Sequence, residues 1–387
     1  MGLAFWRTKA EGPVSTGGRP QVPSWAVPVA GAVAGAGGRA PRSYEAQVRA
    51  AYLANPVAAR AIRLVSEGAG GAPLVSSPAG HPALALLASC GCGASGPGLM
   101  ETLAAQLLLH GNAYVEVACG ADGLPAALYA LRPERVTVEL DARGWPVAYV
   151  YRAGENVTRY AAETAGDEAG LLHIRGFHPL DDHYGMGCLG AAAQAVALHN
   201  AASGWNQALL DNAARPSGAV VYQPGDGSVL SAEQFERLKA EMETGFAGAA
   251  NAGRPMLLEG GLSWQSLSMT PAEMDFARLK DVAAREIALA FGVPPLLLGL
   301  AGDATYSNYK EANVALWRQT LLPLTARILQ ALSAHLRHWW PGLEVRVDRD
   351  AVPALSEDRE RLWAQVAAAA FLTDAEKRAV LGLESAR

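Results

Sequence analysis

Hydrophobic residues recur every three or four positions in the C-terminal half of the chain and predict two long helices there. The first helix opens with a capping box at Thr270 and Glu273, with Pro271 at the first helical position. Its apolar stripe runs to Ala290, and Gly292 and the prolines that follow end it, because proline cannot continue a helix. This segment is therefore expected to bury one face.

A second helical run follows a short loop. We expect Asn308, together with Glu311, to cap this run, and the apolar pattern continues to Trp340. Pro323 lies inside the run and should kink the helix, because proline removes a backbone donor. At a rise of about 1.5 Å per residue, both helices are too long for one compact core.

In the N-terminal half, the hydrophobic residues follow the helical period in some segments and the alternating period of strands in others. Helical patterns cover 44–67 and 100–110, and alternating, strand-like patterns cover 113–118, 135–140 and 147–152. Turns as short as Asp122-Gly123 join neighbouring strands, so the pairing should be antiparallel. Strands grouped here and long helices grouped later predict an α+β protein without regular βαβ alternation.

Between these halves the chain predicts a long helix, a short strand and a further helix. An alanine-rich helical run extends from Gly190 to about Asn212, and a strand-like stretch covers 219–222. A capped helix should then begin at Ser231. Its apolar positions lie on one face: Phe235, Leu238, Met242 and Phe246. Small alanine side chains suit close packing of the long helix against neighbours.

Composition adds limits on function. The 387 residues are 50% hydrophobic, which is ample for a core, but only 18% are charged. So low a charged fraction suggests that partners cover much of the surface. The formal net charge is -5, so the chain lacks the basic excess of a protein that grips phosphates tightly.

Cysteine usage and the N-terminal composition both favour a cytoplasmic, non-membrane protein. The cysteines at 90, 92, 119 and 188 form no Cys-x-x-Cys pair, which favours reduced thiols over a zinc site. Residues 1–40 are rich in glycine, alanine and proline and predict a flexible arm. Their longest apolar stretch, 26–36, is much shorter than the roughly 20 residues of a membrane helix.

Motifs for common enzyme chemistry are missing from the sequence. It contains no Gly-Lys dipeptide, and therefore no phosphate-binding loop of the Gly-x-x-x-x-Gly-Lys-[Ser/Thr] kind. It also contains no Gly-x-Ser-x-Gly turn and no His-Glu-x-x-His pair. Any energy-driven step must therefore be powered by a partner.

One glycine-rich turn supports an alternative reading as a nucleotide-binding enzyme. Gly185-x-Gly187-x-x-Gly190 satisfies the dinucleotide-binding pattern and opens a helix. The context is unfavourable, because the nearest strand ends near Arg175 and two aspartates in between would repel a pyrophosphate.

A cluster near the same turn has side chains that can bind a divalent metal: His173, His178, Asp181, Asp182 and His183. Histidines packed or hydrogen-bonded at a subunit contact account for it more simply. We therefore expect no metal site.

Several blocks, in the same order along the chain, resemble the portal proteins of tailed bacteriophages. The resemblance is to the Hong Kong 97-type branch, which includes the portals of prophages and gene transfer agents. The matching blocks include 55–63, 108–115, 179–185, 212–218, 253–261, 284–300 and 302–309. Small size, an arginine bias and a short C-terminal region favour a gene transfer agent.

The resemblance implies a portal-type subunit with a mixed α/β wing, two stem helices, a small α/β clip, a long kinked helix and a short helical crown. The implied boundaries are a flexible arm 1–43, wing 44–187, stem helix 188–215, clip 216–269, second stem helix 270–299, tunnel loop 300–308, kinked wing helix and strand 309–355, and reduced crown 356–387.

It also implies a structural protein without catalytic residues, cofactor or metal. Such subunits form a homo-oligomeric ring, usually a dodecamer, around double-stranded DNA that is bound without sequence specificity. The implied partners are the terminase large subunit, a head-completion or adaptor protein and the major capsid protein, with no membrane. The implied location is the portal vertex of the virion, after assembly in the cytoplasm of a bacterial host.

Two sets of residues are candidates for contact with DNA. The resemblance implies that the tunnel loop at the channel includes Gly302, Asp303, Ala304, Thr305 and Tyr306. Candidate phosphate contacts, interleaved with acidic residues, are Arg278, Lys280, Arg285 and Lys310. Such sparse cations suit DNA that must slide past, whereas the alternative is that they form solvated faces or salt bridges between subunits.

Overall fold

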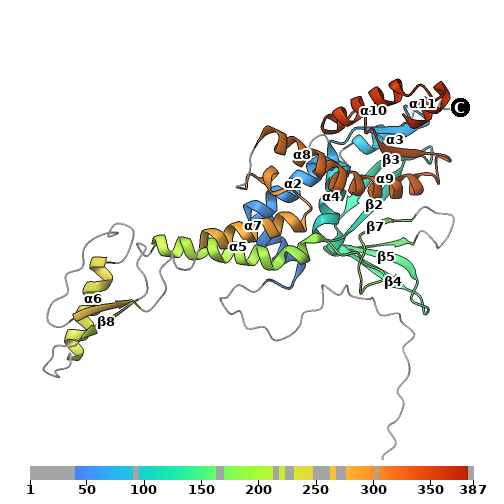
Figure 1. Ribbon diagram of the computed structural model, residues 1–387. Coiled ribbons are helices and arrows are strands. Elements are labelled where there is room, and N and C mark those ends of the chain that lie inside the picture. Colours follow the sequence, from blue (N-terminus) through green and yellow to red (C-terminus); the bar gives the residue numbers. More distant parts are fainter. Residues whose placement is uncertain are drawn as a thin grey trace, which may run out of the picture.

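The computed structural model describes residues 40–89, 96–162, 170–211, 218–222, 231–246, 262–266, 276–300 and 305–381. These residues form an elongated molecule (Figure 1). A globular body at one end holds most of the strands and several helices, and a stalk of two long helices projects from it. A small unit lies at the far end of the stalk, so the stalk separates two parts of the subunit.

The strands form four small sheets whose pairs, among the described residues, are all antiparallel. In the body these sheets are ordered β1-β10, β3-β2-β7 and β4-β5-β6, and the distal unit holds β8-β9. The strands are β1 Leu74–Ser77, β2 Asn112–Cys119, β3 Pro125–Leu131, β4 Val136–Leu140, β5 Pro146–Ala153, β6 Asn156–Ala161, β7 Leu172–Arg175, β8 Gly218–Tyr222, β9 Leu262–Ser266 and β10 Glu344–Val347. The α+β prediction is confirmed.

Helices surround the sheets and build the stalk. Those of the body are α1 Tyr44–Val48, α2 Pro56–Gly70, α3 Ala83–Ala88, α4 Leu99–Leu109, α8 Tyr306–Leu316 and α9 Leu322–Leu336. The stalk holds α5 Cys188–Asp211 and α7 Phe276–Ala290, the distal unit holds α6 Ala232–Phe246, and the C-terminal region holds α10 Ser356–Ala368 and α11 Asp374–Val380. Short 3₁₀ or π turns are η2 Arg49–Leu53, η3 Pro133–Arg135, η5 Pro295–Leu298, η6 Trp317–Leu321 and η7 Pro353–Leu355.

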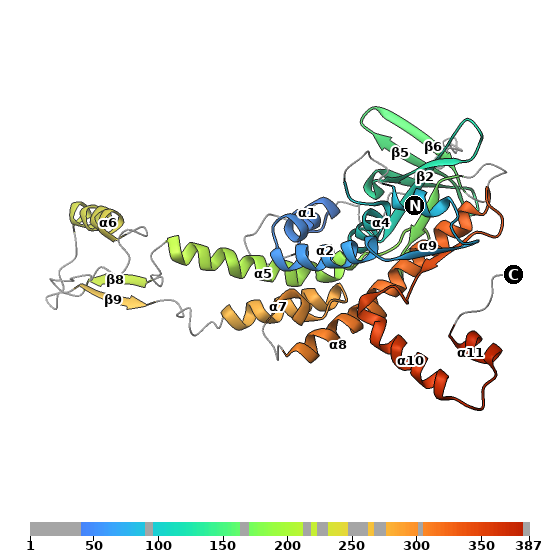
Figure 2. The ribbon, with the colours of Figure 1, turned by 90° about the horizontal axis from the view of Figure 1, so that it is seen from above.

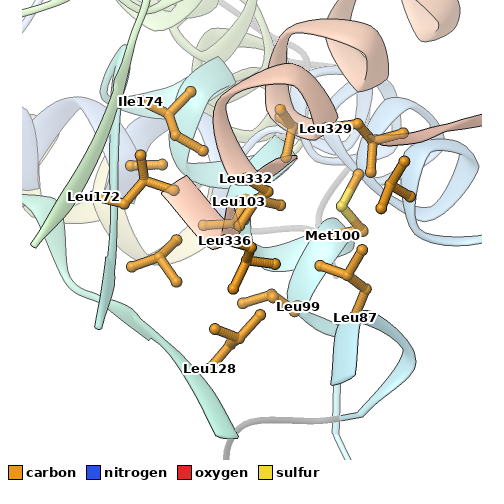
Figure 3. Packing of buried hydrophobic residues seen from close by; sticks show 14 of the residues in the cluster. Leu87, Leu99, Met100, Leu103, Leu128, Leu172, Ile174, Leu329, Leu332 and Leu336 are labelled. Atoms are coloured by element: carbon orange, nitrogen blue, oxygen red, sulfur yellow. The ribbon is translucent and has the colours of Figure 1, made fainter. Parts of the chain in front are cut away.

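The main core of the body lies between α4, α9 and the β3-β2-β7 sheet (Figure 3). Helix α4 contributes Leu99, Met100 and Leu103, and α9 contributes Leu329 and Leu336 from the opposite side. These side chains are almost completely removed from water, which is the dominant favourable term in folding. Because α9 comes late in the chain, the C-terminal half completes a core that the N-terminal half begins.

A second core joins the body to the stalk. Ile62 of α2 and Val196 of α5 are fully buried, together with Ile287 of α7. Helices α5 and α7 run side by side away from this core in both views (Figures 1 and 2). Further along the stalk, the rings of Trp205 and Phe276 stack with their centroids 5.9 Å apart. The stalk is therefore a pair of packed helices, and one end of the pair is buried in the core of the body.

The helical pattern predicted over 44–67 is confirmed, apart from a break at residues 54–55. Helix α1 gives way to the π turn η2, and α2 begins only at Pro56. Pro56 lacks the N–H that a continuing helix would need, and the Asn55 side chain accepts a hydrogen bond from Ala58 N at 2.9 Å. Asn55 thus starts a new helix instead of continuing the first.

The second C-terminal helix also begins and ends differently from the prediction. Its N-cap is Thr305, whose hydroxyl accepts from Asn308 N at 3.2 Å, so Asn308 is not the cap. The helix ends at Leu336, before Trp340. The π turn η6 directly precedes α9, and Pro323 lies in the first turn of α9.

The end of the first C-terminal helix agrees with its predicted stop signal. Gly292 has a φ of 65°, the left-handed conformation that glycine adopts most easily after a helix. The Thr320 hydroxyl donates to its carbonyl oxygen at 2.6 Å, which fastens the end of α7 to η6. The predicted capping box at Thr270 lies outside the described residues.

Candidate functional site

The candidate phosphate contacts on α7 differ in how far they are free to meet a ligand. Arg278 is exposed, whereas the Arg285 side chain donates to Asp281 Oδ2 at 2.9 Å, one helical turn away. Lys280 is half-buried near α5. Burial, and then the nearby charge of Lys280, lowers the pKa of His199 on α5. Of these three cations, Arg278 is the most accessible.

Lys310 lies apart from the stalk cations. It lies in α8, just after the predicted tunnel loop, and its ammonium group forms an ion pair with Glu357 of α10. Gly302, Asp303 and Ala304 lie outside the described residues, and Tyr306 is the first residue of α8. The predicted loop 300–308 therefore ends at Thr305 in the structure, and its last three residues are helical.

The glycine-rich turn at 185–190 is filled by protein backbone. A Cβ on Gly185 would lie 2.1 Å from the carbonyl oxygen of Gly111, and one on Gly187 would lie 2.8 Å from that of Leu108. Gly111 has a φ of 82°, and a Cβ there would lie 2.3 Å from the carbonyl carbon of Met186. Two stretches of backbone thus touch where a nucleotide fingerprint would need space for a pyrophosphate.

Only the last glycine of the motif has open space around it. Gly190 is exposed in the first turn of α5, with no heavy atom within 4 Å of a Cβ built on it. The glycines at 185 and 187 therefore serve backbone packing, and the motif is divided between two unrelated environments. The nucleotide-binding alternative has no supporting site.

Asn112 is the residue that holds this contact together, and the sequence analysis missed it. Its side chain accepts from Gly185 N at 2.6 Å and donates to Gly185 O at 3.0 Å, which fixes the orientation of the amide. The amide nitrogen also contacts His110 Nδ1 at 3.1 Å, and the amide oxygen contacts His173 Nε2 at 3.0 Å. The sequence His110-Gly111-Asn112, directly after α4, is the local pattern that could have pointed to this contact.

Both histidines are held neutral by this arrangement. An amide nitrogen can only donate, so His110 Nδ1 must accept and cannot carry a proton. Burial lowers the pKa of His110 to about 4. Burial, followed by the charge of Arg175 and the proximity of the His110 ring, lowers the pKa of His173 to about 3. His173 also stacks on Tyr114, with the ring centroids 4.3 Å apart.

The other members of the predicted histidine and aspartate cluster shape a loop. Asp181 Oδ1 accepts from His183 N at 2.8 Å and from Tyr184 N at 2.9 Å. His178 Nδ1 accepts from Leu180 N at 3.1 Å. Within the described ranges, no three histidine, cysteine, aspartate or glutamate side chains gather as metal ligands would.

The described cysteines carry free thiols. Cys119 is exposed, and Cys188 is half-buried at the start of α5, where burial raises the pKa of its thiol. Cys90 and Cys92 lie outside the described residues. Among the helices that the structure describes, none is long and apolar enough to cross a membrane.

Comparison with known proteins agrees with the fold and with the sequence blocks. The family model for phage portal proteins matches residues 56–382. A protein of Rickettsia bellii is 41% identical over 341 residues, which cover 86% of this chain and 88% of that protein. A chain in the neck of a native gene transfer agent particle, computed with C12 symmetry, is 47% identical.

This neck chain aligns over 90% of the present chain and 96% of its own length, with a TM-score of 0.68. A Hong Kong 97 family portal protein from Corynebacterium diphtheriae is 18% identical, with a TM-score of 0.54 over 78% of this chain and 96% of that one, and so shares the fold. By sequence and by fold, the present chain belongs to the phage portal protein family.

Proposed function

We propose that copies of this chain form a closed ring at one vertex of a phage-like particle, and that double-stranded DNA passes through the ring during packaging and release. The observation that carries the proposal is the 47% identity to a neck protein of a gene transfer agent particle, over almost the whole of that protein. The C12 symmetry of that neck favours twelve subunits here. The role is structural, and a gene transfer agent is the favoured particle.

The described architecture suits such a ring. In this proposal the body is the wing, α5 and α7 form the stem, and β8, α6 and β9 form the clip. Helices α10 and α11 would be the crown, and the segment that ends at Thr305 would be the tunnel loop. A long stem with a small unit at its tip separates the clip from the wing, so each can contact different proteins (Figure 2).

Electron microscopy of the purified protein in negative stain, together with mass photometry, tests the proposal directly. We expect closed rings of about twelve subunits, with a hole wider than a DNA duplex. Monomers or dimers at every concentration and salt condition would contradict it. Because the subunits would assemble by mass action, the titration should extend to micromolar protein.

The partners follow from this placement. We propose that the clip docks the terminase large subunit during packaging and a head-completion protein afterwards, and that the wing contacts the major capsid protein. Assembly would take place in the cytoplasm of the bacterial host, before the particle is filled. The sequence offers no ATP-binding loop, so the terminase would supply the energy.

Among the candidate phosphate contacts, we propose that Arg278 contributes most. It is exposed on α7, whereas Arg285 and Lys310 are engaged with carboxylates. With ring-shaped protein and a duplex of about 30 base pairs at low salt, Arg278→Ala should weaken DNA binding several-fold. The slope of the logarithm of the binding constant against the logarithm of the salt concentration should also become shallower, by about one phosphate contact for each subunit that touches the DNA.

Lys310→Ala is the matched control. It also removes one positive charge, but the Lys310 ammonium group is already paired with the Glu357 carboxylate. It should change binding and the salt dependence less than Arg278→Ala does. Fluorescence anisotropy over a salt series measures both quantities. An equal effect of the two variants would contradict the assignment to Arg278.

A further inference from the structure

The loop between β7 and α5 exposes two large apolar side chains. We call residues 176–183 the apolar loop, in which Phe177 is 84% and Leu180 is 90% exposed. Large apolar side chains this exposed within one ordered loop are the kind of feature that marks a surface which another molecule covers. The loop is therefore a candidate contact surface.

The apolar loop is held firmly from both ends. Gly176 N donates to Gly111 O at 2.7 Å on one side. On the other side Asp181 caps the turn, and the Tyr184 hydroxyl accepts from Val138 N at 2.9 Å. A loop that is already ordered loses little conformational entropy on binding, so its exposed side chains can act as anchors.

A second copy of the chain offers a surface that fits this loop. We call residues 42–63, which contain α1, η2 and the first part of α2, the arginine corner. Leu53 is 68% exposed there, beside a partly exposed Tyr52. The corner contains four arginines, three of which form ion pairs with Glu45 or with Glu67 just beyond the corner, whereas the apolar loop contains two aspartates and directly follows Arg175. With Glu67 and Arg175 included, the corner keeps a net charge of +2 (four arginines, two glutamates) and the loop a net charge of -1 (one arginine, two aspartates). The two surfaces are thus complementary in charge and are both partly apolar.

Both surfaces lie where the stem joins the wing. The apolar loop leads directly into α5 at Cys188, and the arginine corner is tied to α5 by a hydrogen bond from Asn200 Nδ2 to Ala50 O at 2.8 Å. A ring contact is head-to-tail and joins two different surfaces of neighbouring subunits.

We propose that the apolar loop of one subunit docks on the arginine corner of the next subunit, with Phe177 and Leu180 packed against Tyr52 and Leu53. This inference rests on the proposed ring and names the contact that closes it. Opposite charges around an apolar centre would favour the correct neighbour and fix the register.

The first test replaces the anchors. Phe177→Ser with Leu180→Ser should raise the protein concentration needed for rings at least tenfold, measured by mass photometry. Trp145→Ser is the matched control, because Trp145 is a large exposed side chain in the turn between β4 and β5 and belongs to neither surface. It should leave ring formation unchanged. Circular dichroism confirms that the variants are folded.

The second test uses disulfide formation and does not depend on losing assembly. In a background with the native cysteines replaced by alanine, Leu180→Cys with Leu53→Cys should give a ladder of covalent oligomers after oxidation. Leu180→Cys with Trp145→Cys should not. Rings that form normally with both serines present, or that give no ladder from the first pair, would overturn the inference. Failure of the parent protein to form rings would instead overturn the proposed function, and this inference with it.

Discussion

Gly185→Ala is expected to destabilise the subunit by more than about 4 kcal/mol, enough to prevent normal folding of the wing. The added methyl group would lie 2.1 Å from Gly111 O and 2.5 Å from Gly176 N. Both are backbone atoms, which cannot rotate away as a flexible side chain can. The substitution would also pull Gly185 away from Asn112, which binds both its N–H and its carbonyl group.

Gly190→Ala provides the control from the same motif. Gly190 is helical and faces open space, so alanine there should leave the free energy of unfolding within about 1 kcal/mol of the parent, on the stabilising side. Urea unfolding followed by circular dichroism, at a concentration where the protein is monomeric, compares the two variants. Similar stability of both would mean that the glycine contact is not tight in solution.

Lowering the pH from 7.5 to 5 is expected to destabilise the subunit by up to about 2 kcal/mol for each of His110 and His173. Their folded pKa values are about 4 and about 3, below the roughly 6.5 of an unfolded histidine. Between the folded and unfolded pKa values, the unfolded chain therefore binds more protons than the folded chain does. Stability is complete above about pH 6.5 and falls as the pH decreases toward the folded pKa values.

Urea unfolding at several pH values between 7.5 and 5 measures this slope, and most carboxylates stay ionised in that range. His173→Gln is an informative variant, because its amide nitrogen can still donate to the Asn112 oxygen but does not titrate. It should show about half the parent's loss of stability. An unfolding free energy that stays constant from pH 7.5 to 5 would contradict the neutral histidine pair.

Local sequence signals predicted the elements that depend on local physics. The long α5 and the stop at Gly292 followed from helical periodicity and from a residue suited to the left-handed conformation. Strands β2, β4 and β5 followed from alternation between polar and apolar residues. Each of these features is encoded within a few residues of itself.

Features that depend on distant contacts were missed or misread. Strand β1 was not predicted, because its short sequence becomes a strand only beside β10, whose residues come near the end of the chain. The cap was predicted at Asn308 but lies at Thr305, because both residue types are suitable and only the path of the chain decides between them. The glycine motif was ambiguous for the same reason, since its partner backbone at Gly111 is far away in sequence.

The candidate site was predictable only as a region. Sequence pattern and family resemblance pointed to α7 and to the segment before α8, but ion pairing separates cations that look equivalent in the sequence. Arg285 has an acidic residue one turn away on its own helix, which could have been noticed. The partner of Lys310, Glu357, lies on a helix that follows almost fifty residues later, and no local pattern connects them.

Pairing of β1 with β10 has a consequence for the timing of synthesis. Ser76 lies opposite Val345, so the first strand of the wing has no partner until nearly the whole chain has left the ribosome. Leu329 and Leu336 likewise complete a core begun by α4. Contacts between such distant residues form late and slowly. A nascent or prematurely terminated chain would therefore lack a finished wing, which would keep incomplete subunits from entering a ring.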